Sequence, residues 1–213
     1  MAILFNASPG PSVFFVSSIG SLEGKWAAVC SALGLATGSV IHALLAGIGV
    51  TAIVAANETL SILIAFFGGL YVIYLGISGF SNNDDNQYVQ ARGKGAIEKK
   101  SLGTCYRQGV MVEFLNPKTI IFYTSILSGL LALGQYQPAE AILISMIVPA
   151  TALPIDMMFG IAGGHLSVMS SSSKSKRLVT SLSSFTLVGV GAYMLWANVL
   201  SPLTPYVGFN SPI

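Results

Sequence analysis

The stretch Glu113-Phe114-Leu115-Asn116-Pro117-Lys118 places an acid, an amide, a proline and a base directly ahead of the apolar run 119–133. A second interruption, Ser8-Pro9-Gly10-Pro11-Ser12, divides the apolar run 3–19 near the start of the chain. Proline removes a backbone hydrogen bond and breaks a helix. We therefore predict two helices that are broken inside apolar segments, with the other apolar segments arranged around them.

The composition indicates a membrane protein. Of 213 residues, 53% are hydrophobic and only 8% are charged, and the mean hydropathy is +0.74. A soluble domain carries about 25% charged residues. Because the apolar runs are continuous rather than alternating, they predict an all-α, multi-pass protein and not a β-barrel. Six segments are long enough to cross a bilayer: 2–20, 27–55, 60–80, 108–133, 139–164 and 179–200.

The first segment is interrupted early. Only eight residues precede Pro9, enough for about 12 Å of helix at about 1.5 Å per residue, which is under half of a ~30 Å hydrocarbon core. We expect either a short first helix or a start further upstream. No base precedes the run and prolines divide it, which argues against a signal peptide.

The basic residues predict the orientation. All ten lysines and arginines lie in the loops after the first, third and fifth segments or at the start of the fourth, and the other loops and both ends carry none. The positive-inside rule then places these odd-numbered loops in the cytoplasm and both termini on the outer side.

Three segments, one long loop and three more segments predict a single transporter domain built as a 3+3 repeat. An odd number of crossings in each half inverts one half relative to the other, and the two broken helices then occupy matching positions. Polar runs at Ser81–Gln87 and Ser170–Lys176 are expected to be linkers. The predicted division is a first repeat at 1–80, a cytoplasmic loop at 81–107, a second repeat at 108–200 and a tail at 201–213.

Broken helices can bind charged ligands. Half-helix N-termini offer N–H groups to a carboxylate, and freed carbonyl groups suit an ammonium group or a cation. Two opposed breaks could hold both ends of a zwitterion. The alternative is that both breaks are structural kinks that serve helix packing.

Two acids stand in or against apolar segments, and such acids usually face a cavity or a partner. Asp156 follows Pro154 in the fifth segment and is the first candidate for proton coupling or for contact with a substrate ammonium, although a polar contact between helices is the alternative. Glu113 is the second candidate, and an ion pair with Lys118 or Arg107 is its alternative. His42, inside the second segment, is expected to be a hydrogen-bonded residue of the bundle.

The sequence lacks the motifs that are typical of metal sites, enzymes and nucleic-acid binding. No histidine pair is spaced for a metal, no phosphate-binding loop or nucleophile elbow occurs, and no basic aromatic surface suggests a nucleic acid. We expect no metal, no cofactor, no nucleic-acid partner and no enzymatic activity. Cys30 and Cys105 match no paired motif and are expected to be free thiols. The small-residue pairs Gly34/Gly38 and Gly160/Gly164 are expected to pack helices closely and make a homodimer plausible.

Three motifs, in this order and spacing, resemble the LysE/RhtB family of amino-acid exporters. They are Ser8–Ser12 with the later glycines Gly24, Gly34 and Gly38; Gly68–Gly76; and Gly109–Lys118 with Phe122. The resemblance covers residues 8–129. The family often has an uncharged polar residue where Glu113 stands.

The resemblance implies a secondary exporter of amino acids or close derivatives in the bacterial inner membrane, driven by the proton gradient. Functional weight would fall on Pro9, Gly10, Pro11, Asn116, Pro117 and Lys118. Asp156, with Glu113, would carry the proton during alternating access. The competing hypotheses are a passive channel for small solutes and a membrane subunit of a redox or assembly complex.

Overall fold

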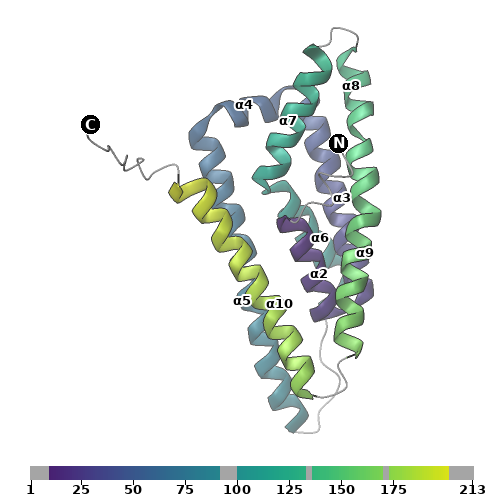
Figure 1. Ribbon diagram of the computed structural model, residues 1–213, viewed down its shortest axis with the longest axis vertical. Helices are drawn as coiled ribbons and strands as arrows, with labels where there is room; N and C mark the ends of the chain where they lie inside the picture. Colours follow the sequence, from purple (N-terminus) through teal and green to yellow (C-terminus); the bar gives the residue numbers. More distant parts are fainter. Residues whose placement is uncertain (1–9, 92–99, 133–135, 170–172, 202–213) are drawn as a thin grey trace, which may run out of the picture.

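The computed structural model describes residues 10–91, 100–132, 136–169 and 173–201. Within these ranges every regular element is a helix, as predicted for an all-α chain (Figure 1). The helices are α2 (Pro11–Glu23), α3 (Lys25–Gly47), α4 (Val50–Ala56), α5 (Glu58–Ala91), α6 (Leu102–Phe114), α7 (Pro117–Ala132), α8 (Pro138–Ser145), α9 (Ile147–Met169) and α10 (Ser173–Leu195), with a π-helical turn η1 (Trp196–Leu200).

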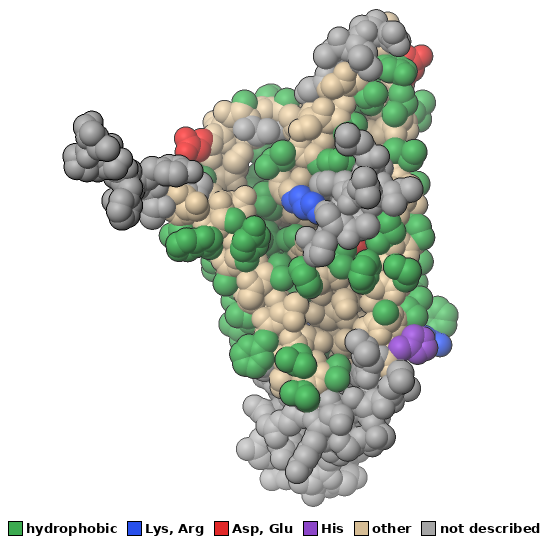
Figure 2. Space-filling view, in the orientation of Figure 1, with side chains coloured by type: hydrophobic (Ala, Val, Ile, Leu, Met, Phe, Trp, Pro, Cys, Tyr) green, Lys and Arg blue, Asp and Glu red, His purple; other side chains and the backbone are tan. Residues whose placement is uncertain are grey.

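Four stretches of described helix are long and apolar enough to cross a membrane: Lys25–Gly47, Glu58–Ser78, Ala139–His165 and Ser181–Leu200. Figure 2 shows hydrophobic side chains distributed over the face in view and few charged ones. Helices α2 and α6 have 13 residues each and α7 has 16. Each is shorter than the ~20 residues that a crossing requires.

The helix boundaries differ from expectation in three places. The second segment ends at Gly47, because Gly49 adopts a φ of +80° before α4 begins. Helix α5 continues through the expected linker Ser81–Gln87, and α10 begins inside the expected linker at Ser173. Extending an existing helix gains one hydrogen bond for each residue fixed. Polar residues can therefore lengthen a membrane helix that is already formed.

Helix α2 lies at the centre of the described structure. Its Phe15, Val16 and Ile19 are fully buried and form one core cluster with residues of α3, α5, α6 and α10. The start of α2 at Pro11 is therefore held among the other helices. Cys30 and Cys105 are free thiols, as predicted, and Cys105 is fully buried in the same cluster.

The helices associate mainly as three pairs, α3 with α6, α2 with α9 and α5 with α10, and the last pair is seen side by side in Figure 1. Glycines allow each pair to approach closely. A methyl group on Gly34 would overlap the carbonyl oxygen of Tyr106, and one on Gly20 would overlap that of Gly160. At the third pair, a Cβ on Gly191 would lie 2.6 Å from the carbonyl oxygen of Gly69.

The predicted packing role of the Gly34/Gly38 and Gly160/Gly164 pairs is confirmed. All four glycines face other helices of the same chain. These contacts already occupy the surfaces from which a homodimer was predicted, so a homodimer would need a different interface.

We predict that Gly34→Leu destabilises the protein, because the side chain has no room against α6. Overpacking costs typically about 1–3 kcal/mol. The thermal unfolding midpoint in detergent should fall clearly for this variant. Gly129→Leu is the matched control, since no heavy atom lies within 4 Å of a Cβ built there. Equal unfolding midpoints for the two variants would contradict the close α3–α6 contact.

Candidate functional site

The chain breaks its helix between α6 and α7. Helix α6 ends at Phe114 and α7 begins at Pro117, which lacks an N–H group and disfavours a helical conformation in the residue before it. Asn116 caps the new helix. Its Oδ1 accepts a hydrogen bond from the Lys118 N–H at 3.1 Å, and its carbonyl oxygen accepts one from the Thr119 N–H at 3.1 Å.

This capping corrects one expectation. The N–H groups of Lys118 and Thr119 are already used by Asn116. The sequence suggested that the first turn of α7 offers its N–H groups to an anion. These two N–H groups are not available for that purpose. An anion near this break would meet the side chain of Lys118.

The start of α2, where the other break is predicted, is capped differently. Gly10 is the N-cap residue in an extended conformation, Pro11 follows, and no side chain of the described residues caps the helix. The positive end of the α2 dipole is therefore not covered by a side-chain oxygen of its own cap. Pro9, also predicted to be a site residue, lies outside the described residues.

The carboxylate of Glu113 joins the two breaks. Ser12, in the first turn of α2, donates a hydrogen bond to Glu113 Oε2, and Thr119 Oγ1 donates one to Oε1 at 2.9 Å. The Ser12 hydroxyl also accepts a hydrogen bond from Asn116 Nδ2 at 3.2 Å. Glu113 is 7% exposed. A buried carboxylate requires such donors, so the first turns of α2 and α7 are held together around this one side chain.

Helix α3 packs against Glu113 and Phe114. His42 Nε2 lies 3.1 Å from the Glu113 carbonyl oxygen, and its ring stacks on Phe114 with 5.6 Å between ring centroids. His42 is thus a hydrogen-bonded residue of the bundle, as predicted. Gly38 leaves room for the acid, because a Cβ there would lie 2.8 Å from Glu113 Cβ.

Asp156 lies on α9, 5% exposed, and lines a small cavity of about 40 Å³ together with Ser12, Ser39, Glu113, Asn116 and Lys118. In the part of the chain that the structure describes, no hydrogen bond or ion pair engages its carboxylate. Because a water needs roughly 10–15 Å³ of such volume, the cavity has room for a few waters or for an ammonium group. The structure therefore places both predicted acids on one cavity.

A second cavity of about 760 Å³ lies between the starts of α2 and α7 on one side and α10 with η1 on the other. It shares Gly10, Asn116 and Lys118 with the small cavity. Helix α10 contacts α2 at one end, where Ser18 Oγ donates to the Ser183 carbonyl at 3.2 Å. It diverges from α2 toward the other end, as Figure 1 shows. The cavity occupies this divergence and has the size of a ligand pocket.

Sequence reasoning missed Ser12, Thr119, Ser39 and Tyr123. The first two supply the donors to Glu113, and Ser39 Oγ lies 2.8 Å from the Tyr123 hydroxyl in the adjoining buried region. For Ser12 and Thr119 the available signal was a hydroxyl within three residues of a proline that starts a helix, whereas Ser39 and Tyr123 had no such signal. The residues of α10 that line the large cavity carried no such signal.

The described structure is that of a multi-pass helical membrane protein in which the start of α2 and the break between α6 and α7 meet at a buried polar site. Residues 3–198 match the family model of the LysE type translocator, and the chain belongs to that family. A match to a family of translocators supports transport rather than catalysis.

Three relatives illustrate the family. An uncharacterized membrane protein, YrhP, of Bacillus subtilis is 25% identical over 90% of this chain and 93% of its own. The threonine efflux protein of Escherichia coli is 30% identical over 57% of this chain and 58% of its own. The homoserine/homoserine lactone efflux protein of Salmonella typhimurium is 27% identical over 73% of this chain and 71% of its own. No solved structure matches the chain.

We predict that Thr119→Ala destabilises the protein, because it leaves one buried oxygen of Glu113 without its donor. Leaving such a group unsatisfied costs about 1–3 kcal/mol, which the thermal unfolding midpoint in detergent at neutral pH should register. Thr124→Ala is the control, since among the described residues its hydroxyl bonds only the Ile120 carbonyl of the same helix. If the control melts no higher than Thr119→Ala, Thr119 does not stabilise the Glu113 carboxylate.

Proposed function

We propose that this protein exports amino acids or close derivatives from the cytoplasm in exchange for protons, by alternating access. The observation that carries the proposal is that Glu113 and Asp156 line one small cavity, which shares the wall residues Gly10, Asn116 and Lys118 with a large one. Relatives named as threonine and homoserine efflux proteins support the substrate class.

The proposed transporter crosses the membrane six times as an inverted 3+3 repeat. The crossings are the first predicted segment, which includes α2, then α3 and α5 in one half, and α6 with α7, α8 with α9, and α10 with η1 in the other. The packing supports this division, because exchanging the two halves converts the α3–α6 pair into the α9–α2 pair and leaves the α5–α10 pair unchanged. Inverted repeats with interrupted helices at their interface are typical of secondary transporters.

The proposed orientation places both termini in the periplasm of a bacterium and the basic helix ends in the cytoplasm. Lys25 at the start of α3 and Lys100 just before α6 lie at the basic end. The large cavity is lined by the stretches of α7 and α10 that lead away from that end. The described conformation is then an outward-facing one, with its cavity on the periplasmic side.

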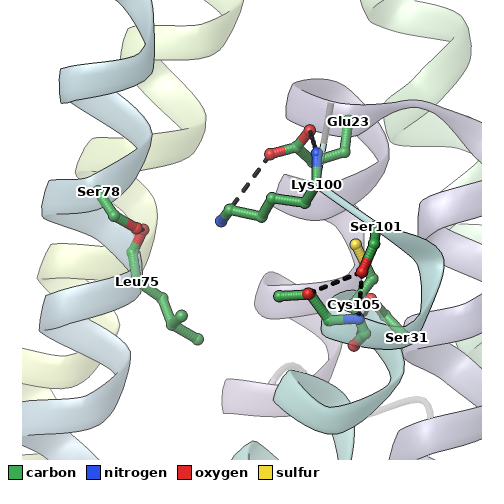
Figure 3. Close-up of polar contacts among 8 residues, drawn as sticks. Glu23, Ser31, Leu75, Ser78, Lys100, Ser101 and Cys105 are labelled. Atoms are coloured by element: carbon green, nitrogen blue, oxygen red, sulfur yellow. Dashed lines mark hydrogen bonds and ion pairs between the residues drawn. The ribbon is translucent and has the colours of Figure 1, made fainter. Parts of the chain in front are cut away.

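The opposite, cytoplasmic end is closed by polar contacts near the loop that joins the halves (Figure 3). Lys100 Nζ lies 3.8 Å from Glu23 Oε1, and the Lys100 N–H donates to Glu23 Oε2 at 3.3 Å. Beside them, Ser31 Oγ donates to the Cys105 carbonyl at 3.2 Å. Opening toward the cytoplasm would require these contacts to separate.

In the proposed cycle, proton and substrate compete for the same carboxylates. A proton from the periplasm neutralises Asp156 or Glu113 and removes the attraction for a substrate ammonium group, which favours release. On the cytoplasmic side the proton leaves, and the restored charge attracts the next ammonium. Protonation of Glu113 would also alter its hydrogen bonds to Ser12 and Thr119, and so the contact between the two breaks.

We predict that Asp156→Asn abolishes uncoupler-sensitive efflux, because an amide cannot carry the proton. Efflux of preloaded labelled amino acids should fall to the level of cells without the transporter, while the amount in the membrane is unchanged. Glu58→Gln is the matched control, since it neutralises an exposed acid at the start of α5. Full, uncoupler-sensitive efflux by Asp156→Asn would exclude this residue from coupling. Efflux by the wild-type protein that ignores the uncoupler would favour a passive channel.

We predict that Glu23→Gln weakens the cytoplasmic closure. A salt bridge of this kind contributes up to about 1 kcal/mol, or roughly a fivefold change in the open population. Cys105 is fully buried beside the contact and reports on it. In a Cys30→Ser background, a membrane-permeant thiol reagent should alkylate Cys105 faster in Glu23→Gln than in Glu58→Gln. Equal rates would mean that the Glu23–Lys100 contact does not control opening at this end.

A further inference from the structure

The two cavities share wall residues but differ in their chemistry. Among the described residues that line the large cavity, Lys118 is the one with a charged side chain. Most of the remaining wall is apolar or aromatic, from Phe14, Ile121, Phe122, Val190, Tyr193 and Met194. The small cavity instead contains both acids, Glu113 and Asp156, with Lys118 at its edge.

This distribution of charge orients a zwitterion at the junction of the two cavities. An α-ammonium group fits the small cavity, where two carboxylates converge and one of them has no partner among the described residues. The α-carboxylate then lies at the Lys118 ammonium and the uncapped start of α2 at Gly10. With the ammonium and carboxylate groups placed in this way, the side chain of the amino acid extends into the large cavity.

The large cavity is open on one side, since its wall residues Ile121 and Tyr193 are exposed, and it has room for a large side chain. A cavity of about 760 Å³ falls in the range of roughly 300–1,000 Å³ that encloses drug-sized ligands. The side chain of threonine has three heavy atoms and would leave most of this space to water against apolar walls. Burying an additional methylene group strengthens binding by about fourfold, so larger apolar side chains gain progressively.

We propose that the transported substrates are α-amino acids with large apolar or aromatic side chains, which bind with the side chain in the large cavity between α7 and α10. This inference rests on the proposed export function and names its substrate class. It assigns Lys118 to the carboxylate, Glu113 and Asp156 to the ammonium group, and the wall of α10 to side-chain selection.

Two glycines give a matched test of the cavity. Gly189 on α10 lines the large cavity, and Gly129 on α7 is not among its lining residues. At both positions no heavy atom lies within 4 Å of an added Cβ. The first side-chain atom therefore meets no neighbour at either position, and of the two only position 189 lines the large cavity.

The experiment measures efflux of phenylalanine, leucine, alanine and threonine from proteoliposomes loaded with each amino acid under an imposed proton gradient. The wild-type protein should export phenylalanine and leucine with apparent KM values at least tenfold below those for alanine and threonine. Gly189→Trp should raise the KM for phenylalanine and leucine at least tenfold and change those for the small substrates less than threefold. Gly129→Trp should match the wild type for all four. Thr186→Trp, which fills the same cavity from one turn away, provides a second variant if Gly189→Trp does not reach the membrane.

The outcomes separate the two proposals. Export of threonine and alanine without leucine or phenylalanine would overturn the selection inference and leave the export function standing. An equal effect of Gly189→Trp on large and small substrates would also overturn the inference, because side-chain selection would then not lie in this cavity. Export of none of the four amino acids would overturn the inference, and it would overturn the proposed function as well if homoserine were also not exported.

Discussion

The buried carboxylate of Glu113 is the constraint on which the rest of this structure depends. A charge near the centre of a membrane costs about 3 kcal/mol or more unless partners compensate it. Its partners come from the first turns of two different helices, Ser12 in α2 and Thr119 in α7. Because Ser12 also accepts from Asn116, moving either half-helix disturbs the donors of the acid. The site is thus built by the need to satisfy one charge.

Close helix packing determines where the space around that charge lies. Glycines draw α3 to α6, α2 to α9 and α5 to α10, and these contacts use backbone against backbone. The α5–α10 pair meets α2 near Ser18 and diverges from it farther along. The resulting cavity reaches the polar site from one side, while Glu23 and Lys100 join the chain at the other end. Such an asymmetry is what a transporter requires in one of its two states.

Much of this arrangement was predictable from local sequence. The low charge predicted a helical membrane protein, Pro117 marked the end of α6, and Glu113 and Asp156 stood out as acids in apolar surroundings. Long-range contacts were not predictable, because Ser12 and Glu113 are 101 residues apart. The capping of α7 by Asn116 reversed the expectation of free N–H groups there, since an asparagine ahead of a proline can bind the ligand or its own helix. The large cavity depends on the angle of α10, for which no residue pattern gave a signal.

The coupling of amino-acid movement to proton movement is the central claim, and one measurement tests it directly. The purified protein is reconstituted into vesicles that contain a pH-sensitive dye, and an amino-acid gradient is imposed with no initial pH difference. The account predicts that amino acid leaving the vesicles drives protons in, so that the interior acidifies and the change disappears when the vesicles contain no protein. Amino-acid efflux with an unchanged interior pH would contradict it.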